Sequence, residues 1–230
     1  MSRRACWRHW HARSSSTTPN AATSSTSPEP HSRRERRLVA TGRSSASGPE
    51  VQWALDAITG AAAFVSNQRL DLLAANQLGR ALFSELYAPA RPVNSARFVF
   101  LDPRAETFYD DWERVAGECV AILRWAAGRD PHDRDLSDLV AELATHSEAF
   151  RTRWAAHDVR FHNTGVKHFH HPVVGELSVS LNRFDLPADH DLTIFICATE
   201  PGSRSEEALK LLGSWVAAAE SAHATPREGS

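Results

Sequence analysis

The spacing of apolar residues separates a helix-forming stretch in the middle of the chain from a strand-forming stretch after it. From residue 108 to residue 156, apolar side chains recur every three to four positions, which is the repeat of amphipathic helices. In Glu176–Asn182 the repeat shortens to two, because Leu177, Val179 and Leu181 alternate with polar residues. This alternation predicts an antiparallel strand with one buried face.

Two long helices are expected in the middle stretch. The first ends at Gly128 and Pro131, and its apolar stripe is Trp112, Val115, Ala116, Cys119, Ile122 and Leu123. The second begins at Asp135 as a candidate N-cap, and its stripe is Leu136, Leu139, Val140 and Leu143. Residues 147–157 extend the helical region and place Phe150 and Trp154 on one face.

Shorter elements precede and follow these helices. Helices are predicted over residues 51–59 and 77–87, and the apolar runs on both sides of Asn67-Gln68 predict a β-hairpin. Arg97–Pro103 is expected to be extended. Leu192–Glu200 predicts a central strand, and residues 203–221 predict a C-terminal helix. The predicted fold class is therefore α+β, an antiparallel sheet with a helical insertion and flanking helices.

Composition marks residues 1–50 as a different kind of chain. They hold nine Arg, no Lys, three Glu and 16 Ser or Thr, whereas the other 180 residues hold 17 basic and 25 acidic side chains. So few large apolar side chains predict a disordered basic segment. The expected domains are this segment, a folded domain over residues 51–219 and a disordered tail over residues 220–230. The run Arg33–Arg37 leaves nucleic-acid binding through phosphates open as an alternative.

Cysteine usage and hydropathy point to the cytoplasm. Cys6, Cys119 and Cys197 are odd in number and far apart, which argues against a disulfide framework. No apolar run approaches the ~20 residues needed to span a bilayer. The basic N-terminus also lacks the apolar core of a signal peptide. A cytoplasmic protein is the resulting prediction.

Five histidines raise the question of a metal site: His157, His162, His168, His170 and His171. A zinc site needs three or four ligands that converge on one point. If this region enters a strand, His168 and His170 project to a solvated face beside Lys167, and His171 projects to the opposite face. No metal or other cofactor is therefore expected, although a metal-dependent enzyme built on these histidines stays open as the alternative function.

The motifs of other enzyme classes are missing from the sequence. It contains no GxSxG, HExxH or GxGxxG pattern, and Cys119 and Cys197 lie on core-like stripes. A protein without catalytic activity is expected. Bulky apolar side chains gather in the middle stretch instead: Phe108, Tyr109, Trp112, Trp125, Phe150 and Trp154. These residues form either plain core or the lining of an apolar ligand pocket.

Several long stretches, in order along the chain, resemble the MmyB-like ligand-binding domain of actinobacterial transcription regulators. They are FVSNQRLDLLAANQLGRAL, NSARFVFLDPRAETFYDDWERVA, AGRDP, FRTRWAAHDVRFHNTGVKHFHHPVVGELSVS and ATEPGSRSEEALKLL. The resemblance implies a PAS-like fold whose apolar pocket holds a fatty-acid-like molecule, with no catalysis. It also implies a helix-turn-helix that binds DNA before this domain, in proteins that are usually dimers.

Residues 1–50 depart from that family pattern, because they lack the apolar repeat of a helix-turn-helix. One hypothesis is a frameshift, since the DNA behind Ser16–Pro19 could read Tyr-Tyr-Thr in another frame. The expected partners are thus a small apolar ligand and a second copy in a homodimer. DNA is expected as a partner only if a helix-turn-helix is restored upstream, and no membrane is expected.

The resemblance directs attention to a pocket between the sheet and the helices. Its expected lining is Phe98, Phe100, Trp112, Val115, Phe150 and Trp154, with sheet residues such as Leu177 and Val179. A ligand carboxylate would need a cationic or donor partner, because burial of an unpaired charge is prohibitive. The candidates are Arg97, Arg124, His157 and His171.

Overall fold

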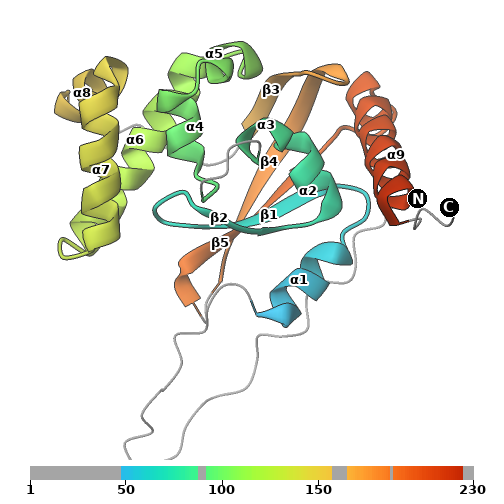
Figure 1. Ribbon diagram of the computed structural model, residues 1–230, viewed down its shortest axis with the longest axis horizontal. Helices are drawn as coiled ribbons and strands as arrows, with labels where there is room; N and C mark the ends of the chain where they lie inside the picture. The colour runs from blue at the N-terminus through green and yellow to red at the C-terminus, as the bar shows by residue number, and fades with distance from the viewer. Residues whose placement is uncertain (1–47, 88–91, 157–164, 187–188, 225–230) are drawn as a thin grey trace, which may run out of the picture. The chain divides into compact units, whose positions relative to one another are not determined.

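A five-stranded antiparallel sheet lies at the centre of the fold in the computed structural model, which describes residues 48–87, 92–156, 165–186 and 189–224 (Figure 1). The strand order is β2-β1-β5-β4-β3. The strands are β1 (Ala62–Asn67), β2 (Leu72–Ala75), β3 (Gly165–His171), β4 (Gly175–Leu186) and β5 (Asp189–Ala198). The β1–β2 hairpin is thus separated in sequence from β3–β5, although β1 pairs directly with β5.

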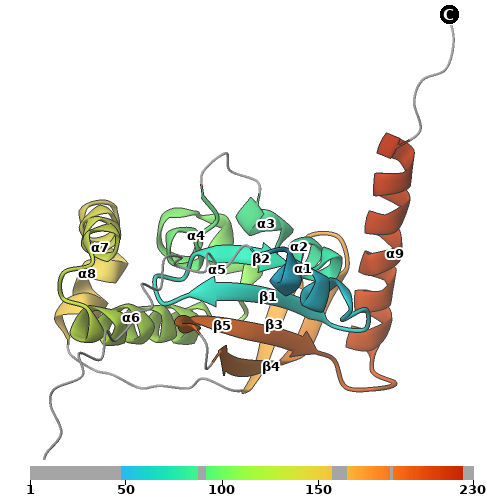
Figure 2. The same ribbon diagram turned by 90° about the horizontal axis from the view of Figure 1, so that it is seen from below.

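Nine helices surround the sheet within the described residues. Four of them are α1 (Pro49–Asp56), α2 (Gln77–Leu82), α3 (Ser84–Tyr87) and α9 (Arg204–Ala224). The other five follow α3 and form the helical insertion before β3: α4 (Ser95–Leu101), α5 (Arg104–Phe108), α6 (Trp112–Arg129), α7 (Arg134–His146) and α8 (Glu148–Ala155). Figure 2 shows α6, α7 and α8 grouped together, at the end of the sheet away from α9. The α+β class and the sheet with a helical insertion are therefore confirmed.

The two faces of the sheet are covered by different helices. On one face the main hydrophobic core joins sheet residues such as Phe64, Phe169 and Leu177 to side chains of α2, α4–α8 and α9. On the other face Leu55 of α1 packs with Val65 of β1 and Leu192 of β5. The insertion and α1 therefore lie on opposite faces, and the insertion belongs to the main core.

Asn76 is a buried polar residue at the junction of β2 and α2. Its Oδ1 accepts hydrogen bonds from the backbone N–H groups of Ala63 (2.9 Å) and Gly79 (2.7 Å). Its Nδ2 donates to the carbonyl oxygens of Ile58 (2.7 Å) and Ala61 (2.9 Å). All four hydrogen-bonding positions of the amide are therefore used, so one side chain caps α2 and also holds the entry to β1.

Strand β3 forms one edge of the sheet, and its outer edge is partly covered. The His168 carbonyl accepts the Asp110 backbone N–H at 3.2 Å, and the Val166 carbonyl accepts from Arg114 at 3.4 Å. On the inner side, Lys167 is only 6% exposed and forms an ion pair with Glu118 of α6. The edge strand is thus joined to the insertion by backbone and charged groups.

The structure corrects three local predictions. Residues 97–101 are helical in α4, not extended: the Asn94 side chain caps the helix, and Phe98, Val99 and Phe100 are all buried. A short helix buried on several sides has the continuous apolar sequence of a strand, which explains the error. Helix α7 is capped by Asp133, two residues before the predicted Asp135. Lys167 lies on the buried face of β3 and not on the solvated one.

Candidate functional site

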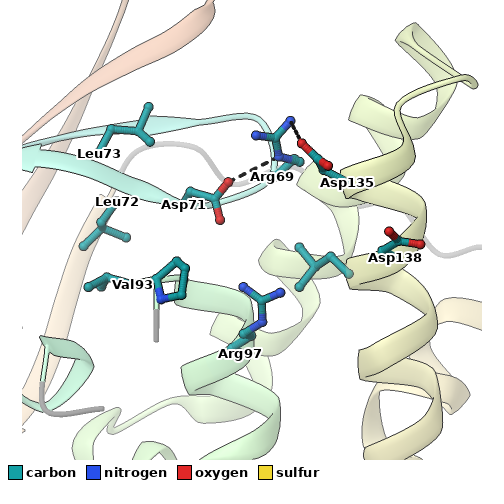
Figure 3. Close-up of a pocket in the computed structure, with 10 residues that line it drawn as sticks. Arg69, Asp71, Leu72, Leu73, Val93, Arg97, Asp135 and Asp138 are labelled. Atoms are coloured by element: carbon teal, nitrogen blue, oxygen red, sulfur yellow. Dashed lines mark hydrogen bonds and ion pairs between the residues drawn. The ribbon is translucent and has the colours of Figure 1, made fainter. Parts of the chain in front are cut away.

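A cleft lies between the β1–β2 hairpin, α4 and α7, with a volume of about 670 Å³ (Figure 3). Its lining is Arg69, Asp71, Leu72, Leu73, Pro92, Val93, Arg97, Asp135, Asp138 and Leu139. The leucines, proline and valine form an apolar wall. Two arginines and three aspartates supply the polar groups. A volume between 300 and 1,000 Å³ with few polar groups is typical of sites for small molecules.

Arg69 stands at the hairpin end of the cleft, surrounded by carboxylates. Its guanidinium lies 3.2 Å from Asp71, 3.2 Å from Asp133 and 3.6 Å from Asp135. The adjoining Leu70 has a φ of 67°, in the left-handed region that non-glycine residues rarely adopt. The Asn67 side chain holds this turn by accepting from the backbone N–H groups of residues 69 and 71. The hairpin turn thus fixes Arg69 toward α7.

Arg97 lies where the cleft meets a second, smaller hollow. That hollow has a volume of about 190 Å³, and its lining is Leu86, Pro92, Asn94, Arg97, Phe98, Leu101 and Asp102. Nε and Nη2 of Arg97 each lie 2.9 Å from Oε2 of Glu142 on α7. Two of the predicted site residues, Arg97 and Phe98, therefore line hollows, and Arg97 is the cation shared by both.

A second group of predicted residues forms an aromatic cluster between α4, α6 and α8. The ring centres of Phe150 and Phe100 lie 5.1 Å apart. The Phe150 ring also stacks on the Trp154 ring. The Phe100 ring also contacts Trp112, whose indole N–H donates to the Val99 carbonyl at 2.9 Å. Val115 is partly buried against the same core. These side chains pack against one another next to α4, which carries Arg97.

Arg124 completes this aromatic cluster. Its guanidinium lies 5.2 Å from the centre of the Trp154 ring, and it donates to the Trp154 carbonyl at the end of α8. Its Nε is buried and has no hydrogen-bond partner among the residues that the structure describes. Cations stabilise helix C-termini, so this arrangement holds α8 against α6. His157, three positions after Trp154, lies outside the described part of the chain.

His171 is buried away from both hollows, with both ring nitrogens occupied. Nε2 lies 3.1 Å from the Ala81 carbonyl, and Nδ1 accepts the Val173 backbone N–H at 3.2 Å. These contacts require a neutral ring protonated at Nε2. Burial lowers the pKa of the imidazole, while the Ala81 bond and Glu85 act in the opposite direction. The ring therefore joins β3 to α2 and has no spare donor for a ligand.

Acid is expected to destabilise the domain through His171. Its pKa is lower in the folded than in the unfolded chain, so the unfolded chain binds the proton first. The contribution of His171 is present above the unfolded pKa of about 6.5 and is lost as the pH falls through the lower folded value. Thermal unfolding from pH 7.5 to 5 should show a smaller loss in His171→Gln than in the parent. Identical slopes in His171→Gln and the parent would contradict the assignment.

The family comparison covers the part of the chain that forms the sheet, the helical insertion and the cleft. The family model described as the MmyB-like transcription regulator ligand binding domain matches residues 48–212, which is most of the chain. The chain belongs to this family. A search of curated proteins gave no match. The matched range includes every element from the start of α1 into α9, so both hollows lie inside the MmyB-like domain.

The histidines of this MmyB-like domain are dispersed where the structure describes them. His168 and His170 are exposed, the first 2.7 Å from the Ser178 hydroxyl and the second 3.1 Å from Asp110, whereas His171 faces the core. Among the described residues, no three His, Cys, Asp or Glu side chains are placed to hold a metal ion. His157 and His162 lie outside those residues. The metal alternative thus stays a prediction, which metal analysis of the purified protein tests.

Two further properties of the MmyB-like domain concern its thiols and its helices. Burial raises the pKa of the Cys119 and Cys197 thiols to about 12, so neither is an activated nucleophile at neutral pH. No helix in the described ranges has the length and apolar character needed to cross a membrane.

Most of the cleft was missed by sequence reasoning. Its lining comes from three separate segments, around residues 69–73, 92–97 and 135–139, and only Arg97 was a predicted site residue. The one available signal was the polar run Asn67–Asp71 inside an otherwise apolar hairpin. That run indicated a turn, but nothing in it indicated that α7 would face it.

Proposed function

We propose that this MmyB-like domain senses a small apolar molecule of fatty-acid character, bound in the cleft with its carboxylate at Arg97. The observation that carries the proposal is the position of Arg97, which reaches two adjoining hollows with apolar walls. An acyl chain needs apolar surface along its length and one donor group at its end. Leu72, Val93 and Leu139 supply surface in the cleft, and Phe98 with Leu101 supplies it in the smaller hollow.

The guanidinium of Arg97 is suited to a carboxylate because its planar fork donates two parallel hydrogen bonds. In the structure it already holds a carboxylate oxygen of Glu142 through Nε and Nη2. A ligand acid would replace one carboxylate with another, so no unpaired charge would be left on Arg97. The other predicted candidates support the proposal less, since His171 has no free donor and Arg124 lines neither hollow.

Helix α4 connects this site to the rest of the insertion. Arg97 and Phe98 face the hollows, while Phe100 of the same helix packs on Phe150 of α8. Trp112 of α6 is hydrogen bonded to the α4 backbone at Val99. A ligand that binds one placement of α4 better than another would shift the population of both neighbouring helices. In a transcription regulator, that shift would alter activity through a non-catalytic mechanism.

The remaining parts of the proposal come from the family resemblance. A second copy of the chain is proposed on that basis, and so is DNA if a helix-turn-helix is restored upstream. A cytoplasmic location is proposed from the cysteine usage and hydropathy of the sequence. The domain limits 51–219 also stay proposals. Native mass spectrometry at several concentrations tests the dimer, which requires a species of twice the 25.4 kDa chain mass.

Binding of dodecanoate, a twelve-carbon fatty acid, tests the proposed ligand class. Native mass spectrometry with lipid extraction should detect a co-purifying acid, and calorimetry on delipidated protein should give saturable binding of dodecanoate. Arg97→Ala should weaken that binding roughly 10- to 100-fold, because a charged hydrogen bond contributes about 1.5–3 kcal/mol. Arg129→Ala is the control, since Arg129 packs on the exposed Trp125 and lines neither hollow. Absence of binding across a range of fatty acids would overturn the proposal.

A further inference from the structure

Helix α7 is joined across the cleft at two separate points. Near its start, Arg69 contacts the N-cap Asp133 and Asp135. Two turns later, Glu142 contacts Arg97. Asp135, Asp138 and Glu142 are spaced i, i+3 and i+7, so they share the face of α7 that looks across the cleft. Figure 3 shows Asp138 on α7, at a level between Arg69 and Arg97.

The ion pairs of Arg69 and of Arg97 differ in how easily a ligand carboxylate can replace the protein carboxylate. Arg69 has three carboxylate partners, and one of them, Asp133, also caps α7 by accepting the Leu136 N–H at 3.1 Å. Arg97 has Glu142 as its one carboxylate partner within the described part of the chain. Both members of that pair keep about a quarter of their side-chain surface exposed. An incoming acid can therefore reach Arg97 and exchange with Glu142 more readily than it can displace three partners from Arg69.

Charge in the cleft also limits what an incoming acid can do. Besides Arg69 and Arg97, the lining holds Asp71, Asp135 and Asp138. A ligand carboxylate that binds Arg97 brings one more negative charge into this group, close to the carboxylate of Glu142. Like charges repel, so a ligand carboxylate at Arg97 binds less tightly while the charge of Glu142 stays beside it.

We propose that Glu142 is an internal competitor for the ligand site, so that an acid ligand binds by displacing Glu142 from Arg97. The inference rests on the proposed function, because it needs an acid ligand at Arg97. It makes Glu142 a specificity-determining residue. An apolar ligand without a carboxylate fills the cleft and leaves the Arg97–Glu142 pair in place. The domain then responds to an acyl acid but not to the matching alcohol.

Affinities for dodecanoate and dodecanol in the full chain and its variants test this inference. Glu142→Gln removes the competing charge with little change in shape. We expect it to raise the affinity for dodecanoate roughly tenfold, which corresponds to about 1.4 kcal/mol. The affinity for dodecanol should stay unchanged. Glu142→Asp, which keeps the charge on a shorter side chain, should give an intermediate affinity for dodecanoate. Glu207→Gln is the matched control, on an exposed site of α9 that lines neither hollow.

Amide hydrogen exchange over residues 134–146 gives a second readout. Dodecanoate should change exchange near Glu142 in the parent protein, because Glu142 loses its contact with Arg97, and dodecanol should leave exchange there unchanged. Equal dodecanoate affinity in the parent, Glu142→Gln and Glu142→Asp would overturn the inference while leaving the proposed function standing. If no fatty acid binds the parent or any variant, the proposed function fails together with the inference.

Discussion

Replacement of Asn76 with alanine is expected to lower the free energy of unfolding by about 3–4 kcal/mol. The substitution removes four hydrogen bonds at once, two accepted by Oδ1 and two donated by Nδ2. It also leaves buried backbone groups of Ala63 and Ala61 without partners, and each such group costs about 1–3 kcal/mol. Because Asn76 links α2, β1 and the segment before β1, no neighbouring side chain replaces these bonds.

Thermal and urea unfolding measure this effect. For a domain of this size, about 3 kcal/mol corresponds to a fall in melting temperature of roughly 10 °C. Asn182→Ala is the control, since Asn182 is half-buried on β4 and donates to the Ser180 carbonyl. It should cost under about 1 kcal/mol. Asn76→Asp should also destabilise the fold, because it loses both donated bonds and turns a charge toward two carbonyls. A loss under about 1 kcal/mol in Asn76→Ala would show that the network is not formed.

The second large effect is expected at the buried pair of Lys167 and Glu118. Glu118→Gln leaves the Lys167 ammonium buried without its carboxylate, and loss of one member of a buried pair costs about 3–5 kcal/mol. Lys167→Met should cost clearly less, because Glu118 keeps Arg114 at 3.2 Å and the methionine fills the apolar site. The two members of one ion pair are therefore expected to give unequal losses.

Urea unfolding of both single variants and of the double variant tests this asymmetry. The double variant Glu118→Gln with Lys167→Met should be more stable than Glu118→Gln alone, since it removes the stranded charge. Glu206→Gln serves as the control, because the Glu206–Lys210 pair on α9 is far more exposed. Equal losses in the two single variants would contradict a buried, singly partnered Lys167.

The elements predicted best were those with a long, regular apolar repeat. Helices α6 and α7 and strand β4 follow the spacing of their apolar residues, and the alternation of β3 correctly separated His168 and His170 from His171. The failures have local causes. Helix α4 is short and buried on several sides, so its sequence lacks the polar face that marks most helices. Lys167 was misplaced because its partner Glu118 lies 49 positions earlier on a different element.

The candidate site was harder to predict than the fold, because a cleft depends on which elements meet. The aromatic residues Phe100, Phe150 and Trp154 were predicted to lie together, and they do. Their rings pack against one another, however, and line neither hollow. Arg69 and Asp138 are 69 positions apart and line the same cleft only through the packing of α7. Their roles are set by tertiary contacts that leave no periodic signal in the sequence.

The covered edge of β3 has a consequence for how this protein behaves at high concentration. An open edge strand offers unpaired carbonyl and amide groups on which another chain can add a strand, and such additions lead to aggregates. Here two outer carbonyls of β3 are already occupied, by the Asp110 N–H and by Arg114. Arg114 is in turn held by Asp111 and Glu118. The start of α6 thus blocks the addition of a strand from another chain at the β3 edge, whether or not a ligand is bound.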